Sequence, residues 1–145
     1  MIRETDFDGK DVGYIVSARE KGFSDGWNGD MVLSAVKGGR FFGYIYEKDG
    51  VPAGFLTYSA GLDGVYDLED LFVEPSERKK GIGGALTARF IRDARLSGGK
   101  KIFLEVRRGN GAAIRLYSSF GFIPISERAK YYADGESATV MLKEF

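Results

Sequence analysis

Two residue types are missing from this chain, and their absence removes whole classes of chemistry. The 145 residues include no histidine and no cysteine. Without an imidazole or a thiol there is no Ser-His or Cys-His nucleophile and no covalent acyl-thioester enzyme. Disulfides and thiolate metal sites are excluded as well, and we expect no bound metal. Any acyl transfer must therefore run directly from donor to acceptor, with carboxylates, tyrosines, water or the backbone handling the protons.

The chain also has no net charge and no long apolar run. The 21 basic and 21 acidic residues cancel, so general attraction to nucleic acid is not expected. No run approaches the roughly 20 apolar residues of a membrane span, and the first residues lack the apolar stretch of a signal peptide. Length and an apolar content of 43% predict one domain over residues 1–145, monomeric or homodimeric. Cytoplasm is the expected location, with no membrane partner.

The hydrophobic periodicity predicts alternating strands and helices. Asp49–Gly50 predicts a hairpin, and Gly121 ends the last helix. Polar loops are expected at 22–28 and 127–137. The order of the elements implies a mixed α/β sheet of about seven strands with helices on both faces. Strands are predicted at 2–5, 41–47, 51–59, 65–73, 101–106, 122–126 and 138–143, and helices at 12–21, around 31–36, at 82–96 and from 110 or 111 to 120.

The most informative segment follows the strand at 65–73. There Arg78-x-x-Gly81-x-Gly83 opens an amphipathic helix. The amide groups of a glycine-rich helix start bear partial positive charge, and Arg78 adds a charge-assisted contact, so the segment predicts a site for a phosphorylated ligand. Lys79 and Lys80 either reach its phosphates or are solvated charges.

Known phosphate loops differ from this segment. A Walker loop is excluded because no G-x-x-x-x-G-K-[ST] run exists. A dinucleotide fingerprint fits poorly, since Leu86 stands at its third glycine and seven residues separate Val73 from Gly81. A nucleotide-binding protein is therefore the weakest of the functions considered.

The Arg-x-x-Gly-x-Gly spacing resembles the acyl-coenzyme A pyrophosphate loop of the GCN5-related N-acetyltransferases. A second block of that family is similar to Leu104-Glu-Val-Arg-Arg-Gly-Asn110 with Ala113, Leu116-Tyr117 and Phe120-Gly-Phe122. The segment from Arg128 to Met141 resembles the C-terminal part of the ribosomal-protein N-terminal alanine acetyltransferases. Lys130 and Ala133 replace the Asn and Pro that usually flank the Tyr-Tyr pair of those enzymes. The resemblance is good over 65–142 and loose over the first 60 residues.

The resemblance implies the fold of this family, with a mostly antiparallel sheet, and acetyl-CoA as co-substrate. The backbone of 71–73 would bind the pantetheine arm by strand-like addition, or simply belong to a buried strand. Asn110 would bind the pantetheine amides or cap its helix. The expected coenzyme-binding residues are Leu71, Phe72, Val73, Arg78, Lys79, Lys80, Gly81, Ile82, Gly83, Gly84 and Asn110.

Three residues are candidates for proton transfer. Glu105 is a charge in the apolar strand Ile102-Phe-Leu-Glu-Val, and the resemblance assigns it the role of base; the alternative is a strand-end carboxylate paired with Arg107 or Lys101. Glu69 competes for that role, as in the polyamine acetyltransferases, or faces solvent. Tyr117 is implied to protonate the departing thiolate, or is a core tyrosine.

Together these features predict an acetyl-CoA-dependent N-acetyltransferase that acts on a primary amine. The acceptor is a protein N-terminus or a small cationic, polyamine-like amine. It is expected to bind between the two predicted polar loops, with Trp27 and Tyr131–Tyr132 as walls or as ordinary packing residues. A non-catalytic acyl-CoA-binding module is the alternative of a different class, although Glu105 and Tyr117 favour an enzyme.

Overall fold

The chain forms one mixed sheet flanked by helices. In the computed structural model, which describes residues 1–7, 9–22 and 29–145, seven strands pair in the order β1-β2-β3-β4-β5-β7-β6. All neighbours are antiparallel except β4 and β5, which are parallel. The strands are β1 (Ile2–Glu4), β2 (Phe41–Lys48), β3 (Val51–Ala60), β4 (Val65–Val73), β5 (Lys101–Arg107), β6 (Ile123–Arg128) and β7 (Ala138–Glu144).

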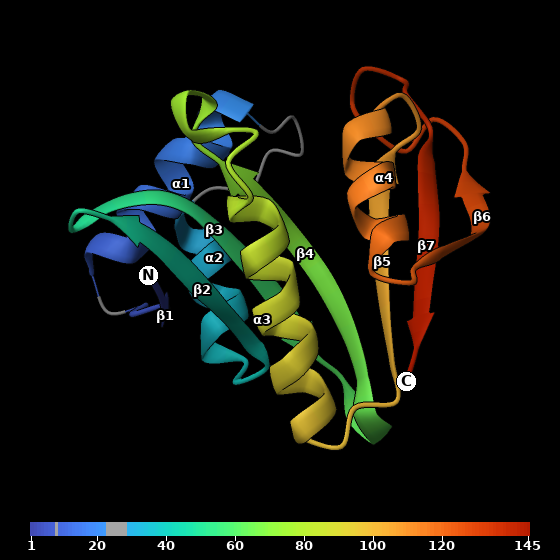
Figure 1. Cartoon of the computed structure of the whole chain (residues 1–145), viewed down its shortest axis with the longest axis horizontal. Coiled ribbons are helices and arrows are strands. Elements are labelled where there is room, and N and C mark those ends of the chain that lie inside the picture. Colours follow the sequence, from blue (N-terminus) through green and yellow to red (C-terminus); the bar gives the residue numbers. More distant parts are fainter. Residues whose placement is uncertain (8, 23–28) are drawn as a thin grey trace.

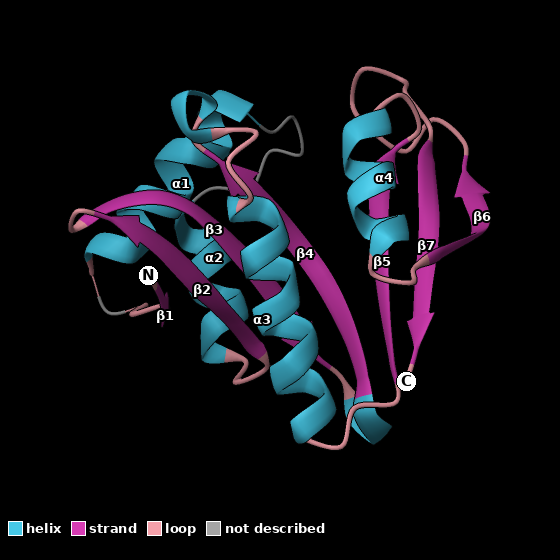
Figure 2. Ribbon diagram, viewed as in Figure 1, coloured by secondary structure: helices cyan, strands magenta, loops and turns pink. Residues whose placement is uncertain are grey.

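Four α-helices lie on the two faces of the described part of the sheet: α1 (Lys10–Gly22), α2 (Gly29–Lys37), α3 (Ile82–Leu96) and α4 (Gly111–Ser119). Figure 2 shows α3 and α4 in front of the sheet and α1 and α2 behind it. The larger apolar core lies under α3 and includes Leu86, Phe90 and Tyr117. A smaller core joins Ile15 of α1 to Phe55 of β3.

The predicted elements and their order are confirmed, with small corrections. Asp49 and Gly50 both adopt left-handed backbone angles, with φ of 53° and 77°, as a tight hairpin between twisted strands requires. β6 continues to Arg128, two residues beyond the predicted strand, because it remains paired with β7 up to Ala138. A short 3₁₀ turn at Leu62–Gly64 was not predicted, whereas the one at Pro75–Glu77 lies where the sequence predicts a turn, at Pro75–Ser76. Trp27 and most of the predicted loop at 22–28 lie outside the described residues.

The feature that positions the site is the separation of β4 from β5. Their parallel pairing covers only Val65–Leu68 and Lys101–Leu104. Beyond these residues β4 stays with β3 as far as Val73, whereas β5 stays with β7 as far as Arg107. Figure 1 shows the two strands diverging, with the start of α3 and the start of α4 both at the open end.

Candidate functional site

Glu69 and Glu105 lie where the two strands part. The last pair of the parallel ladder joins Leu68 to Leu104, so the two glutamates are the first residues beyond it on their strands. Leu68 and Leu104 face the core beneath α3, and alternation places the glutamates on the opposite face. The sheet therefore brings together the two residues that competed for the role of base.

A β-bulge adjusts β4 at this point. The register with β3 shifts between Thr57, which pairs with Asp70, and Tyr58, which pairs with Leu68, so Glu69 is the extra residue. A bulge changes the direction of side chains and bends the strand. Beyond it Leu71 and Val73 pack against the core under α3, while Phe72 stacks on Phe55 at 5.6 Å between ring centroids.

The backbone of 71–73 has one occupied and one open side. β3 pairs with these residues, but among the described residues no strand of the sheet pairs with the other edge of β4 beyond Leu68. An edge of this kind presents N–H and C=O groups to an extended ligand. The predicted strand-like addition of a pantetheine arm thus has a backbone edge available to it.

The loop between β4 and α3 has the backbone geometry of an anion site. Lys79 and Gly81 adopt left-handed angles, with φ of 62° and 84°. Turns that mix right- and left-handed residues point successive amides into a shared concavity. A Cβ at Gly81 would meet no atom within 4 Å, so the space beside it is open. Ile82, the first residue of α3, is 5% exposed and packs in the core.

The charged side chains of this loop also have contacts within the protein. Arg78 donates from Nε to the carbonyl oxygen of Val73 at 3.0 Å, which holds it at the end of β4. Lys80 lies 3.2 Å from Glu77 Oε2, and Lys48 lies 3.1 Å from the same atom. The geometry therefore places Arg78 next to the open strand edge and gives Lys80 an acidic neighbour.

Asn110 and Tyr117 both belong to α4. The Asn110 side-chain oxygen accepts a hydrogen bond from Ala113 N at 3.2 Å and caps the helix. Tyr117 is 6% exposed, and its ring makes an edge contact with Phe122 at 5.9 Å. Burial and the nearby charge of Asp70 raise the pKa of Tyr117, so its hydroxyl keeps its proton at neutral pH. It is both a core residue and a potential proton donor.

Sequence reasoning missed a buried polar cluster beside the bulge. Asp70 forms an ion pair with Arg19 of α1, and Thr57 donates a hydrogen bond to Asp70 at 3.1 Å. Arg19 is 4% and Asp70 8% exposed. A signal existed, because Asp11, Ile15 and Arg19 recur at helical spacing and all are buried on one face of α1.

Two carboxylates on this face of the sheet are harder to ionise than usual. Partial burial is the main reason that the pKa values of Asp67 and Glu69 are raised, and the charge of Glu105 adds to both. Ser59 opposes the shift at Glu69 by donating a hydrogen bond of 2.8 Å. Their carboxylates form no cluster with metal-site geometry among the described residues. The fork between the strands therefore has an acidic face.

Glu105 has a different partner from the two that were considered. Its Oε1 lies 3.0 Å from Arg128 Nε at the end of β6. The partners named in the alternative interpretation are not the ones found, because Arg107 pairs with Asp134 and Glu136, and the Lys101 ammonium lies over the Phe103 ring. The sheet order explains this result, since β7 and β6 follow β5 and bring residues from the C-terminal hairpin to its end.

Both tyrosines of the predicted acceptor wall lie near this ion pair. A hydrogen bond to Glu105 is the main reason that the pKa of Tyr131 is raised to about 12. Tyr132 makes an edge contact with Tyr131 at 5.1 Å and lies under the Arg107 guanidinium at 4.1 Å. The loop between β6 and β7 is thus anchored by contacts to β5, with Tyr131 49% exposed.

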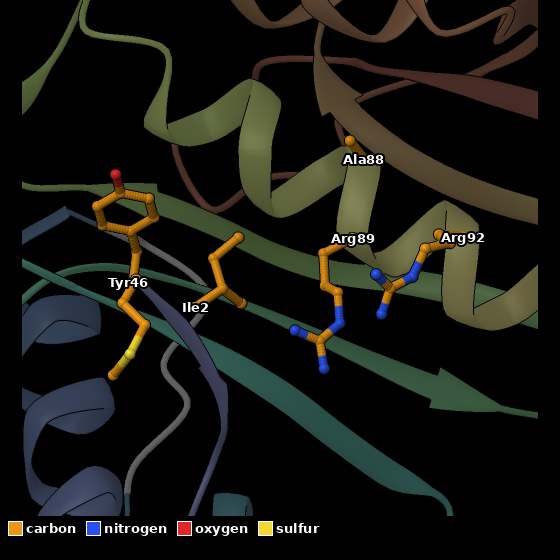
Figure 3. A pocket seen from close by; sticks show the side chains of 6 residues that line it. Ile2, Tyr46, Ala88, Arg89 and Arg92 are labelled. Atoms are coloured by element: carbon orange, nitrogen blue, oxygen red, sulfur yellow. The ribbon is translucent and has the colours of Figure 1, made fainter.

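Two hollows were located in the described surface. One of about 430 Å³ lies between α1 and the end of β4, with Tyr14, Phe72 and Arg78 in its lining, so it adjoins the glycine-rich loop. The other, of about 520 Å³, lies away from the fork, where Figure 3 shows Arg89 and Arg92 projecting from α3 near Ile2 and Tyr46. Both arginines pair with Asp93. In the described part of the chain, no helix has the length and apolarity to cross a bilayer.

Comparison with known proteins identifies the fold. The model of the acetyltransferase (GNAT) family matches residues 8–122. The ribosomal protein bS18-alanine N-acetyltransferase of Escherichia coli (strain K12) is 29% identical over 131 residues, which are 89% of this chain and 86% of that protein.

Solved structures agree with this match. The ribosomal-protein-S18-alanine N-acetyltransferase from Escherichia coli superposes with a TM-score of 0.86 and 28% identity, over 99% of this chain and 94% of that chain. Ard1 from Thermoplasma volcanium gives 0.88 and 25%, over 99% and 96%. The predicted family and fold are confirmed. The chain belongs to the acetyltransferase (GNAT) family and is an acetyl-CoA-dependent N-acetyltransferase.

Proposed function

We propose that this enzyme acetylates the α-amine of a protein N-terminus, with Glu105 as base and Tyr117 as acid. The observation that supports this most strongly is the fork between β4 and β5. Glu105 lies on one face of the sheet, and Tyr117 lies in the core on the other face. The open edge of β4 lies at the fork between them. Direct transfer needs these three features in one place, since no histidine or cysteine is available.

The coenzyme residues in this proposal are those of the open edge and the loop after it. The described geometry fits a phosphorylated, extended ligand, because the β4 edge leads straight to the left-handed turn at Lys79 and Gly81. Leu71, Phe72 and Val73 would bind the pantetheine arm through their backbone. The pyrophosphate would contact Arg78, Lys79, Lys80, Gly81, Ile82, Gly83 and Gly84, with Asn110 nearby at the start of α4.

Glu105, the β4 backbone and Tyr117 then each have a defined role in the reaction. Acetyl-CoA supplies the acetyl thioester. Glu105 removes one proton from the acceptor ammonium, directly or through water, and leaves a neutral amine with a free electron pair. A backbone N–H at the β4 edge stabilises the carbonyl oxygen. Tyr117, which holds its proton at neutral pH, donates it to the departing sulfur. The attacking nitrogen loses its second proton as the amide forms, and this proton returns to Tyr117 through water.

The acceptor class rests on chemistry and on the relatives. An α-amine has a pKa near 8, against about 10.4 for a lysine side chain, so the base has less work to do. The Escherichia coli relative is named for the alanine of a ribosomal protein, which supports an N-terminal acceptor here. The Tyr131–Tyr132 pair beside Glu105 would then contact the first residues of the peptide.

Mass spectrometry of acetylated products tests this assignment. The acceptor is a short peptide with a free N-terminal alanine and an internal lysine, and the matched control is the same peptide with a blocked N-terminus. We expect acetylation of the α-amine in the first peptide and none in the second. Acetylation of the lysine alone, or of spermidine in preference to both peptides, would contradict the proposed acceptor.

A further inference from the structure

The contact between Arg128 and Glu105 has no part in the steps derived above. Arg128 ends the edge strand β6, and its Nε lies 3.0 Å from Glu105 Oε1. Its guanidinium also lies 5.7 Å from the centre of the Tyr131 ring. An ammonium group that gives its proton to Glu105 must come within about 2.6–3.2 Å of the same carboxylate. The Arg128 guanidinium thus lies in the place that the acceptor nitrogen needs.

The groups around Glu105 make a cation at this place favourable. From β4 the carboxylates of Asp67 and Glu69 face it, and both interact with its charge. From the loop after β6, the hydroxyl of Tyr131 interacts with it as well. The β7 residue opposite Glu105 is the uncharged Val140. Arg128 is thus the cationic partner of Glu105 among the described residues.

The Arg128 contact has the properties of a replaceable one. The side chain of Arg128 is 58% exposed, and it forms an ion pair with one oxygen of Glu105. Exposed pairs of this kind contribute little to stability and exchange readily with solvent. Arg107 provides the contrast, because it joins Asp134 and Glu136 at 2.8 and 2.9 Å and also packs on Tyr132. Arg107 anchors the loop, whereas Arg128 has little else to hold it.

We propose that Arg128 occupies the position of the acceptor ammonium in the free enzyme, and that the acceptor displaces it from Glu105. This inference rests on the proposed role of Glu105. A guanidinium cannot give up its proton in a protein, so Arg128 orients the carboxylate without acting as an acid itself. The acceptor ammonium can transfer its proton to Glu105, and its nitrogen then attacks the thioester. Arg128 is a positioning residue that competes with the substrate.

Substitution of Arg128 separates this role from a merely structural one. Arg128→Gln removes the charge and keeps much of the side chain, and Arg128→Lys keeps the charge. The matched control is Arg108→Gln, since Arg108 forms an exposed pair with Glu127 on the same hairpin at 3.4 Å and does not contact Glu105. All proteins are full-length, with the alanine peptide as acceptor and thiol release as the signal.

We expect Arg128→Gln to lower the peptide KM by about two- to fivefold, because the competing cation is gone. The KM for acetyl-CoA should stay unchanged. Arg128→Lys should stay close to the wild type, and Arg108→Gln should match it.

A peptide KM that rises or does not change in Arg128→Gln would overturn the proposal. Calorimetric titration of the peptide into enzyme loaded with coenzyme A gives a second reading that needs no turnover. If the wild type releases no thiol with any amine, the proposed function fails, and the titration still decides the inference. Equal or weaker peptide affinity in Arg128→Gln refutes it; tighter affinity supports it. Thermal melts show whether Arg128→Gln is folded. If it is not, the peptide is titrated into Arg128→Ala, with Arg128→Lys as the variant that keeps the charge.

Discussion

The buried pair between Arg19 and Asp70 leads to a sharp prediction about stability. Asp70→Ala removes the carboxylate that contacts the Arg19 guanidinium and accepts a hydrogen bond from Thr57. Both charged residues are buried, at 4% and 8% exposure. The guanidinium then loses the Asp70 carboxylate in a place that water does not reach. Removing one partner of a buried pair costs about 3–5 kcal/mol.

This cost is large compared with the stability of a small domain, which is roughly 5–15 kcal/mol. For a chain of this size each kcal/mol lowers the melting temperature by about 2–4 °C, so Asp70→Ala should melt roughly 6–20 °C lower. Urea denaturation followed by circular dichroism measures the same change as a free energy of unfolding. The double variant Arg19→Met/Asp70→Leu, which removes both charges, should recover most of the loss.

A surface pair gives the control for this experiment. Arg108→Ala breaks the exposed pair with Glu127, whose side chains are 68% and 51% exposed, and should cost less than about 1 kcal/mol. If Asp70→Ala costs no more than Arg108→Ala, the Arg19–Asp70 pair does not behave as a buried one. A double variant as unstable as Asp70→Ala would also refute the reasoning, because the loss would then come from packing and not from an isolated charge.

Five further substitutions test the site. Gly83→Asp should fold normally, because its Cβ would meet only ordinary contacts at 3.6 Å or more. In the wild type, acetyl-CoA at 100 times its Kd should add about 2.7 kcal/mol of stability. Thermal melts should show that Gly83→Asp loses this stabilisation. Glu105→Gln should lower kcat in the thiol-release assay more than Glu69→Gln does, with a loss that shrinks at high pH, where the amine deprotonates unaided; the reverse order would exchange the two roles. Tyr117→Phe should lower kcat and leave the melting temperature nearly unchanged, whereas full activity with a lower melting point would leave water as the acid. Asp67→Asn should raise the melting temperature at pH 7. Burial raises the pKa of Asp67 in the folded protein, so ionisation of this residue lowers the stability of the wild type as the pH rises through that pKa. The advantage of the variant should vanish below the ordinary pKa near 4, where Asp67 is protonated in both the folded and the unfolded protein.

Most of the fold could be predicted because local and global signals agree in this chain. The strand at 65–73 and the helix at 82–96 have the bounds that periodicity predicts. The Asp49–Gly50 turn and the stop at Gly121 each require a left-handed residue, which these residue types supply. The extra length of β6 could not be predicted, because Glu127 and Arg128 are exposed and have no apolar pattern. Their strand conformation comes from pairing with β7.

The site could be predicted where it depends on residues that are close together in the sequence. The turn after β4 needs glycine at Gly81, and the Asn110 cap follows from residue type and position. The fork beyond Leu68 and Leu104 is a property of two strands that are far apart in sequence, so the sequence analysis did not predict it. The roles of Glu69, Glu105 and Tyr117 in catalysis stay predictions, although the structure brings the two glutamates together.

The partners of the charged residues show most clearly why the rest of the site could not be predicted. Glu105 has cations nearby in the sequence, and the alternative to its role as base therefore paired it with Arg107 or Lys101. The sheet order places β7 and β6 beside β5 and thereby selects Arg128, a residue 23 positions later in the sequence. The same holds for Arg19 and Asp70, whose contact joins α1 to β4 over 51 positions. A charge in an apolar strand indicates that a partner must exist, because burial without one is costly. Which residue fills that role is decided by topology, and at Glu105 the answer is an exposed arginine that an incoming ammonium can replace.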